Sequence, residues 1–272
     1  RVALQNNTTA NANVAVGDRV LFSNTTGTQN VGSGFQTLNS NTTGNNNVAT
    51  GYQAMYHNAT GYSNVAIGTA ALMYSTAGFN NTAVGLEALR SNQANHNIAV
   101  GNQALYANTT GGSNVAIGYR SLLSNTTAYN NVAVGYLSLM SATTGGDNVA
   151  SGYYSLKTNT TGTHNTASGS YALQANTAGG ANQAFGGFTL QANTTGNYNV
   201  AVGYKALFSN TTVSNLTAIG FHALYSNTTG TLNTAVGYES LKYNTTGHSN
   251  TASGYQALYS NTTGIQNVAV GV

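Results

Sequence analysis

One 17-residue unit recurs from one end of the chain to the other, and it constrains the fold more than any other feature. The clearest copy spans 250–266 and reads Asn-Thr-Ala-Ser-Gly-Tyr-Gln-Ala-Leu-Tyr-Ser-Asn-Thr-Thr-Gly-Ile-Gln. A fixed short period is typical of a solenoid, in which each unit contacts only its neighbours. The Gly at the fifth position recurs every 17 residues, except for one interval of 16. These glycines are Gly17, Gly34, Gly51, Gly68, Gly85, Gly101, Gly118, Gly135, Gly152, Gly169, Gly186, Gly203, Gly220, Gly237, Gly254 and Gly271.

The repeat predicts a β-solenoid of sixteen coils, a single array over residues 1–272. We number the positions of a unit as phases 1 to 17, from the Asn that opens it. Phase 1 is Asn in nearly every copy, with Leu216 as an exception, and phase 3 is Ala in every copy except Gly32. Phases 2 and 4 are mostly Val, Ile, Thr or Ser, so phases 1 to 5 predict a short strand with Ala facing a narrow interior. The opposite face, at phases 2 and 4, is expected to be half-buried.

The next stretch, phases 6 to 11, favours a short α or 3₁₀ turn. Phase 8 is small and phase 9 is nearly always Leu, while opposite charges occupy phases 7 and 10 in the pairs Glu87–Arg90 and Glu239–Lys242. Pairs spaced i,i+3 fit a helical turn. Strands stack about 4.8 Å apart, however, whereas helices prefer about 8–10 Å. An all-β coil with two short strands therefore stays open as the alternative.

Phases 12 to 15, commonly Asn-Thr-Thr-Gly, carry residues that favour turns. Stacked coils should align the phase-1 and phase-12 Asn residues into ladders of side-chain amides. Asn-Thr-Thr occurs eleven times and is formally a glycosylation sequon, but its recurrence at one phase favours a turn instead. The one-residue deletion is expected after this turn, near Asn95–Asn97.

Composition argues against several classes of function. Charged residues make up only 4% of the chain, against an ordinary quarter, and the net charge of +3 is too small for a nucleic-acid patch. The chain has no Cys, and Gly pairs such as Gly111-Gly112 lack the context of a phosphate loop. No apolar run is long enough to span a membrane. We expect no cofactor, no metal site and no membrane insertion.

The five His residues are scattered over different phases or distant coils and predict no metal site. Asp147 and His164 share phase 17 in consecutive units, so a stacked contact between them is expected. Without an activated nucleophile beside it, this pair predicts a surface ion pair rather than catalysis. The chain is therefore not expected to be an enzyme.

Aromatic residues form the one candidate contact surface. Tyr119, Tyr136 and Tyr153 share phase 6 in consecutive units, and Tyr154, Tyr171 and Phe188 share phase 7. Stacked rings that support the coils are the first interpretation. A platform for a cell-surface glycan is the second.

The segment Asn-Val-Ala-Ile-Gly-Tyr-Arg-Ser at 114–121, and Asn-Val-Ala-Val-Gly-Tyr at 131–136, resemble the head repeats of YadA-like trimeric autotransporter adhesins. The longer unit with Asn-Thr-Thr-Gly is similar to repeat arrays in bacterial surface proteins and phage tail fibres. The adhesin unit is shorter and lacks the Leu and the Asn-Thr-Thr-Gly turn. The resemblance implies an all-β left-handed parallel β-roll and a trimeric, non-catalytic fibre outside the cell or on a virion.

These observations favour a structural fibre or adhesin segment that is extracellular, at a cell surface or on a virion appendage. A glycan- or receptor-binding module that uses the aromatic columns, and an ice-binding solenoid that uses Thr ladders at phases 13 and 14, remain open. The first and last units are as regular as the others, so uncapped ends are expected. Self-association as a trimer or an end-to-end filament follows from that expectation.

Overall fold

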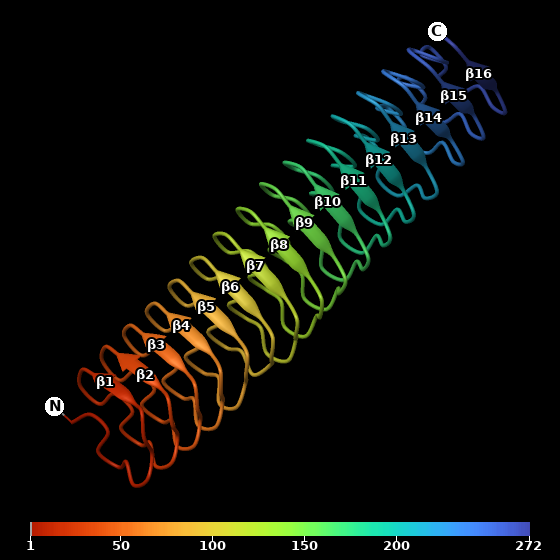
Figure 1. The fold of residues 1–272 in the computed structure, drawn as a ribbon. Coiled ribbons are helices and arrows are strands. Elements are labelled where there is room, and N and C mark those ends of the chain that lie inside the picture. The colour runs from red at the N-terminus through yellow and green to blue at the C-terminus, as the bar shows by residue number, and fades with distance from the viewer. Residues whose placement is uncertain (1) are drawn as a thin grey trace. The chain divides into compact units, whose positions relative to one another are not determined.

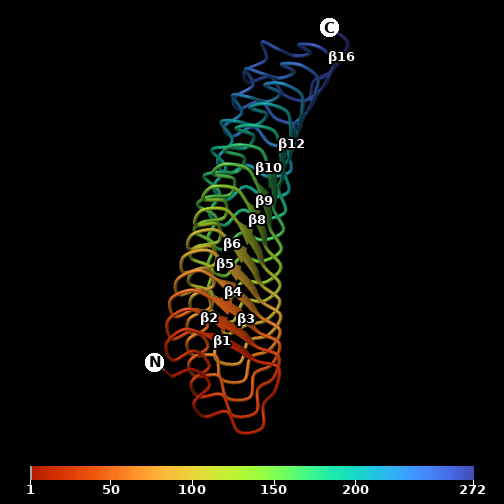
Figure 2. The same cartoon turned by 60° about the vertical axis from the view of Figure 1, so that its left-hand side comes forward.

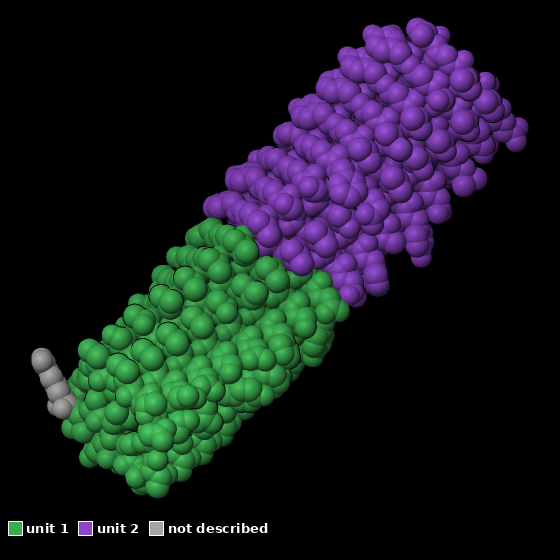
Figure 3. Space-filling model, in the orientation of Figure 1, with its two compact units in different colours: residues 1–131 green, residues 132–272 purple. Residues whose placement is uncertain are grey.

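The computed structural model describes residues 2–272 as a parallel β-solenoid divided into two compact units, 1–131 and 132–272 (Figure 3). Each coil contributes one three-residue strand, and within each unit the strands lie side by side in chain order (Figures 1 and 2). The first unit holds β1 Val14–Val16, β2 Val31–Ser33, β3 Val48–Thr50, β4 Val65–Ile67, β5 Thr82–Val84, β6 Ile98–Val100 and β7 Val115–Ile117. The second holds β8 Val132–Val134, β9 Val149–Ser151, β10 Thr166–Ser168, β11 Gln183–Phe185, β12 Val200–Val202, β13 Thr217–Ile219, β14 Thr234–Val236, β15 Thr251–Ser253 and β16 Val268–Val270.

The strands pair in register, one repeat apart, as the sequence predicts. In β12 and β13, for example, Ala201 pairs with Ala218 and Val202 with Ile219. The phase-3 Ala is fully buried in nearly every coil, whereas phases 2 and 4 are intermediate or exposed. The predicted division of the strand into a narrow inner face and a half-covered outer face is therefore confirmed.

The expected helical turn is wrong, because residues 2–272 contain no helix. Phases 7 and 9 both have positive φ, as at Arg19 (55°) and Leu21 (51°), and a right-handed helix cannot include such residues. Their backbone N–H groups instead donate to other coils: Leu21 N to Thr37 O at 3.1 Å and Gln36 N to Asp18 O at 2.9 Å. A helix would direct its hydrogen bonds within one coil and demand a wider spacing than the strands allow.

A non-glycine residue with left-handed backbone is strained by about 1–2 kcal/mol. The phase-9 Leu offsets that strain through burial, since its side chain is completely buried in coil after coil. Removing a Leu side chain from water contributes roughly 1.5–3 kcal/mol. The Leu column and the Ala column together form the core, which confirms that prediction.

Only Gly fits at phase 5. Gly152, for example, has a φ of 137°, and a Cβ added there would lie 2.6 Å from the carbonyl oxygen of Gly169 in the next coil. A methyl group would force adjacent coils apart at the end of the strand. This close approach of two backbones explains why the repeat keeps a Gly at this phase.

Two ladders of buried Asn side chains join the coils, as predicted. At phase 1, Asn64 donates through Nδ2 to Gly78 O (2.7 Å) and to Asn47 Oδ1 (3.2 Å), and its own Oδ1 accepts from Asn81 N (2.9 Å). At phase 12, Asn58 Nδ2 donates to Asn41 Oδ1 at 2.8 Å. Both kinds of Asn are buried. The sequon Asn at phase 12 is buried in most coils, as at Asn41 and Asn125, whereas Asn7 is exposed.

Leu216 interrupts the phase-1 ladder, as expected. It offers no side-chain oxygen, and Asn233 in the next coil donates instead to Asn227 Oδ1, at 3.4 Å. Asn210 Oδ1, in the neighbouring phase-12 ladder, is buried without a hydrogen-bond partner. The break in one ladder thus coincides with a defect in the other.

The one-residue deletion lies inside the turn rather than after it, which corrects the expected position. Asn92 Nδ2 donates to Ala94 O, two residues later in the chain. In the next coil, the equivalent Asn108 Nδ2 donates to Gly111 O, three residues later. The Gln93 side chain compensates for the missing residue. Its Oε1 accepts hydrogen bonds from Thr76 N at 3.1 Å and from Thr76 Oγ1 at 2.9 Å. A side-chain amide replaces the absent peptide carbonyl.

Leu207→Ala should lower the free energy of unfolding by about 2–5 kcal/mol, because it leaves a cavity in a fully buried column. Leu232→Ala is the matched control, since that Leu is 62% exposed and its truncation should cost under about 0.5 kcal/mol. Equal midpoints for the two variants in chemical denaturation would show that the Leu column is not part of the core.

Asn64→Ala should destabilise the chain by about 1–3 kcal/mol, because it leaves the amide of Asn81 and the carbonyl of Gly78 buried without their partner. Asn102→Ala serves as the control, since Asn102 is exposed. The comparison is made by urea denaturation followed by circular dichroism. A loss no greater than that of the control would mean that the ladder does not stabilise the stack.

Candidate functional site

Five of the six predicted aromatic residues lie in the second unit, where their rings contact one another. Tyr136 and Tyr153 stack with ring centroids 5.3 Å apart and planes 10° apart. Tyr153 contacts the ring of Tyr154 at 4.1 Å, edge to face. The sixth residue, Tyr119, belongs to the first unit, where the Arg120 guanidinium lies 5.1 Å from its ring centroid.

The ring column changes phase part-way along this unit. Ser170 and Gly187 occupy phase 6 in two consecutive coils and supply no ring. Tyr171 and Phe188 at phase 7 fill the gap, stacked 4.9 Å apart with planes 12° apart. Phase 6 then resumes, and ring contacts continue along Tyr204, Phe221, Tyr238 and Tyr255. The sequence predicts the six rings but not this continuous column, because the column depends on side chains that change phase.

Stacking decides what the column can offer to a ligand. Tyr238 and Tyr255 lie 5.2 Å apart with planes 6° apart, so each ring covers the face of the next. The rings therefore present mainly edges and hydroxyl groups to solvent. A sugar that stacks on an aromatic residue needs an open face, so this geometry favours the structural interpretation.

A polar cluster beside the rings was missed by the sequence analysis, apart from one of its ion pairs. Lys242 Nζ lies 2.6 Å from Glu239 Oε1, as the i,i+3 spacing predicts, and Gln256 donates to Glu239 Oε2 at 2.9 Å. His222 Nδ1 lies 3.8 Å from Glu239 Oε1. The signal was present, because His222, Glu239 and Gln256 share phase 7 in consecutive coils.

The surroundings of His222 disfavour its protonation. Its ring lies 4.0 Å from that of Phe221 and 4.9 Å from that of Tyr225, and both ring nitrogens are buried without a hydrogen-bond partner. Burial lowers the pKa of His222, and the positive charges of Lys242 and Lys205 lower it further, against the opposing effect of Glu239. The hydrogen bonds from Lys242 and Gln256 lower the pKa of Glu239.

The first unit contains a related arrangement. Arg90 Nε lies 3.4 Å from Glu87 Oε1, Gln103 donates to Glu87 Oε2 at 2.8 Å, and Arg90 Nη1 donates to the Tyr106 hydroxyl at 2.9 Å. In both units a phase-7 Glu is bound by a phase-10 cation and by the Gln of the following coil. These partners contact both oxygens of each carboxylate.

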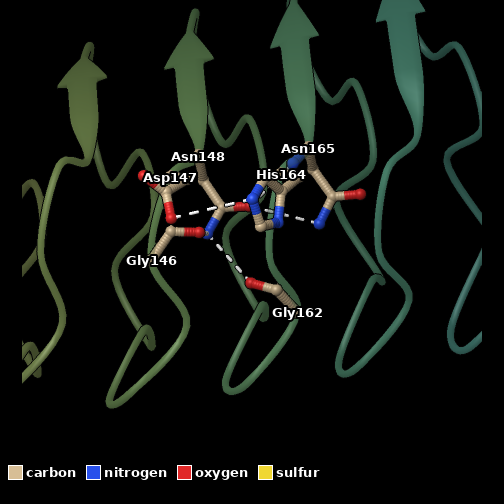
Figure 4. Close-up of polar contacts among 6 residues, drawn as sticks. All are labelled: Gly146, Asp147, Asn148, Gly162, His164 and Asn165. Atoms are coloured by element: carbon tan, nitrogen blue, oxygen red, sulfur yellow. Dashed lines mark hydrogen bonds and ion pairs between the residues drawn. The ribbon is translucent and has the colours of Figure 1, made fainter.

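The expected contact between Asp147 and His164 is present in the second unit (Figure 4). Asp147 Oδ2 lies 3.8 Å from His164 Nε2, and both side chains are largely exposed. Beside them, Asn148 Nδ2 donates to Gly162 O at 2.9 Å, and Asn148 Oδ1 accepts a hydrogen bond from Asn165 Nδ2 at 3.2 Å. The pair is a surface contact above a buried ladder.

Residues 2–272 contain no group of three or more His, Asp or Glu side chains placed to hold a metal ion. None of them forms a helix of the length and apolarity needed to cross a bilayer. Comparisons with protein-family models, curated proteins and solved structures found no match for this chain.

Acidification should destabilise the second unit through His222. A folded-state pKa below the ordinary 6.5 means that the unfolded chain binds the proton more tightly, so stability is full above pH 6.5 and falls as the pH drops below it. The substitution His222→Gln introduces at this phase-7 position the same residue type as Gln256, which also occupies phase 7. It should reduce the loss of melting temperature between pH 7 and pH 5, measured by circular dichroism.

His164→Gln is the control for this experiment, because His164 is 68% exposed and its contact with Asp147 is open to water. It should leave the slope of melting temperature against pH close to that of the unaltered chain. Identical slopes for all three proteins would exclude His222 as the origin of the acid sensitivity.

Proposed function

We propose that this chain is a structural segment of an extracellular fibre or adhesin, at a cell surface or on a virion appendage, that associates with copies of itself. The main support is that coil after coil uses its polar groups to bind the next coil. Backbone amides, both Asn ladders and the phase-13 hydroxyls all bond between coils. Such a chain is expected to resist extension and shear, because hydrogen bonds join each coil to its neighbour at many points around the coil.

The surface supports the same proposal. The well-shielded charged groups of Glu239 and Lys242 neutralise each other, and Gln256 donates a hydrogen bond to Glu239. The outer face of the sheet instead consists of a long strip of half-exposed Val, Ile and Thr side chains. Exposed apolar strips of this kind mark surfaces of association.

The two alternatives have less support. A glycan platform needs ring faces that stacking covers, as at Tyr238 and Tyr255. An ice-binding Thr ladder needs free hydroxyl groups, but the phase-13 hydroxyls donate to the next coil, as Thr160 Oγ1 does to Thr177 O at 3.0 Å. The phase-14 threonines lie in a turn rather than on a flat strand.

Self-association is tested by analytical ultracentrifugation over a hundredfold range of concentration, with electron microscopy of the same samples. We expect the mass to rise above that of a single chain at micromolar concentration, with elongated particles. A glycan array and a thermal-hysteresis assay test the alternatives in parallel. A chain that stays monomeric throughout while binding a defined glycan would replace the fibre proposal with the binding module.

A further inference from the structure

Within residues 132–272, the outer face of the sheet is left uncovered by other segments. We call the phase-2 and phase-4 side chains of β8 to β16 the outer strip. Several of its apolar members at phase 4 are similarly exposed, with Val202 at 37%, Ile219 at 39% and Val236 at 38%, and Val270 in the last coil is 81% exposed. Their neighbours in the same sheet cover their sides and leave their tips in water. No other segment of the second unit covers these tips.

The outer strip has the size of the largest patch on an ordinary monomer, with uncharged Ser, Thr and Gln at eight of its eighteen positions. Nine strands of three residues cover roughly 400 Å² in projection, with strands about 4.8 Å apart and about 3.3 Å per residue. The largest apolar patch on a typical monomer is about 300–600 Å² and is often functional. The adjoining phase-6 rings, such as Tyr238 at 42% exposure, extend this surface in the coils that carry them. A stable protein interface buries about 800 Å² per partner.

The composition of the outer strip narrows the choice of partner. No Asp, Glu, Lys, Arg or His occupies phase 2 or phase 4 in any coil. A partner that placed a charge against this strip would bury that charge unpaired, at a cost of several kcal/mol. The fitting surface is therefore itself neutral, and the outer strip of another copy meets that requirement.

The period of the outer strip points to the same partner. Identical phases lie in register on successive strands, as Val202 does beside Ile219, so the columns repeat at the strand spacing of about 4.8 Å. Side chains of two such sheets interdigitate along their whole length only if both have this period, as in the dry interfaces between paired sheets of stacked, in-register strands. A second copy of the chain has the same period.

We propose that the outer strip packs face to face against the outer strip of a second copy, giving a two-fold pair. This inference rests on the proposed self-associating fibre and specifies its contact surface. Two strips that face each other can pack along their length, with the sheets about 10 Å apart. Three strips around a three-fold axis would each face the axis and contact the others mainly along their margins. The geometry therefore favours a pair over the trimer that the adhesin resemblance implies.

The test uses the full chain with paired substitutions on adjacent coils. Val202→Glu with Ile219→Glu places two charges in the outer strip. Thr212→Glu with Thr229→Glu is the matched control, because it adds the same charges one coil apart at exposed phase-14 positions away from the strip. Ultracentrifugation should give a pair for the unaltered chain and the control. The strip variant should be monomeric, with its dissociation constant raised at least a hundredfold.

A second variant guards against misfolding. Val202→Thr with Ile219→Thr uses a residue already found in the strip, as at Thr234, and should raise the dissociation constant by about tenfold with an unchanged circular dichroism spectrum. Pairing that is equally tight in the strip variant and the control would overturn the proposed surface but leave the self-associating fibre standing. A trimeric mass for the unaltered chain would overturn the two-fold pair alone. A monomer at all concentrations would overturn both proposals.

Discussion

Hydrogen bonding between coils is the constraint on which the rest of this structure depends. Parallel strands of adjacent coils must lie about 4.8 Å apart, and the chain must hold that spacing around the whole coil rather than only along β1 to β16. The φ values of about 50–60° at phases 7, 9 and 17 follow from this requirement. They turn the backbone N–H groups of those residues toward neighbouring coils, where Leu21 N and Gln36 N find their acceptors. Each coil is thereby thin enough to stack.

The same constraint determines which side chains each phase accepts. Gly152 approaches the carbonyl group of Gly169 too closely for any Cβ, and Ala fills the narrow interior behind each strand. Asn suits phases 1 and 12 because one amide both donates and accepts along the stack, as Asn64 does. Where the side-chain amide is missing from phase 1, the hydrogen bonds between neighbouring coils are weaker. Leu216 leaves Asn233 with a longer hydrogen bond, of 3.4 Å to Asn227.

The proposed function relies on extended surfaces of the coils rather than on a concave site. The carboxylates of Glu87 and Glu239 are occupied by a cation and a Gln, and the ring faces are largely covered by neighbouring rings. The outer strip is the extended apolar surface that remains uncovered in the second unit. The proposed self-associating role accounts for a strip that carries no charged residue and repeats with a single period.

The sequence by itself determined the repeat, the strand at phases 1 to 5, the buried Ala and Leu columns and both Asn ladders. These features depend on one residue type per phase, so a pattern of spacing is enough to reveal them. The Asp147–His164 and Glu239–Lys242 contacts were predictable for the same reason, since a shared phase or an i,i+3 spacing fixes the distance.

Only the tertiary structure decided how phases 6 to 11 turn, because Leu and Arg rarely adopt positive φ and no local propensity predicts it. The continuous ring column of the second unit also needed the structure, since Tyr171 and Phe188 replace rings that are missing from another phase. The position of the deletion was decided by Gln93, whose side chain substitutes for a peptide group. In each case the deciding contact lies in an adjacent coil, 16 or 17 residues away, where local sequence patterns carry no signal.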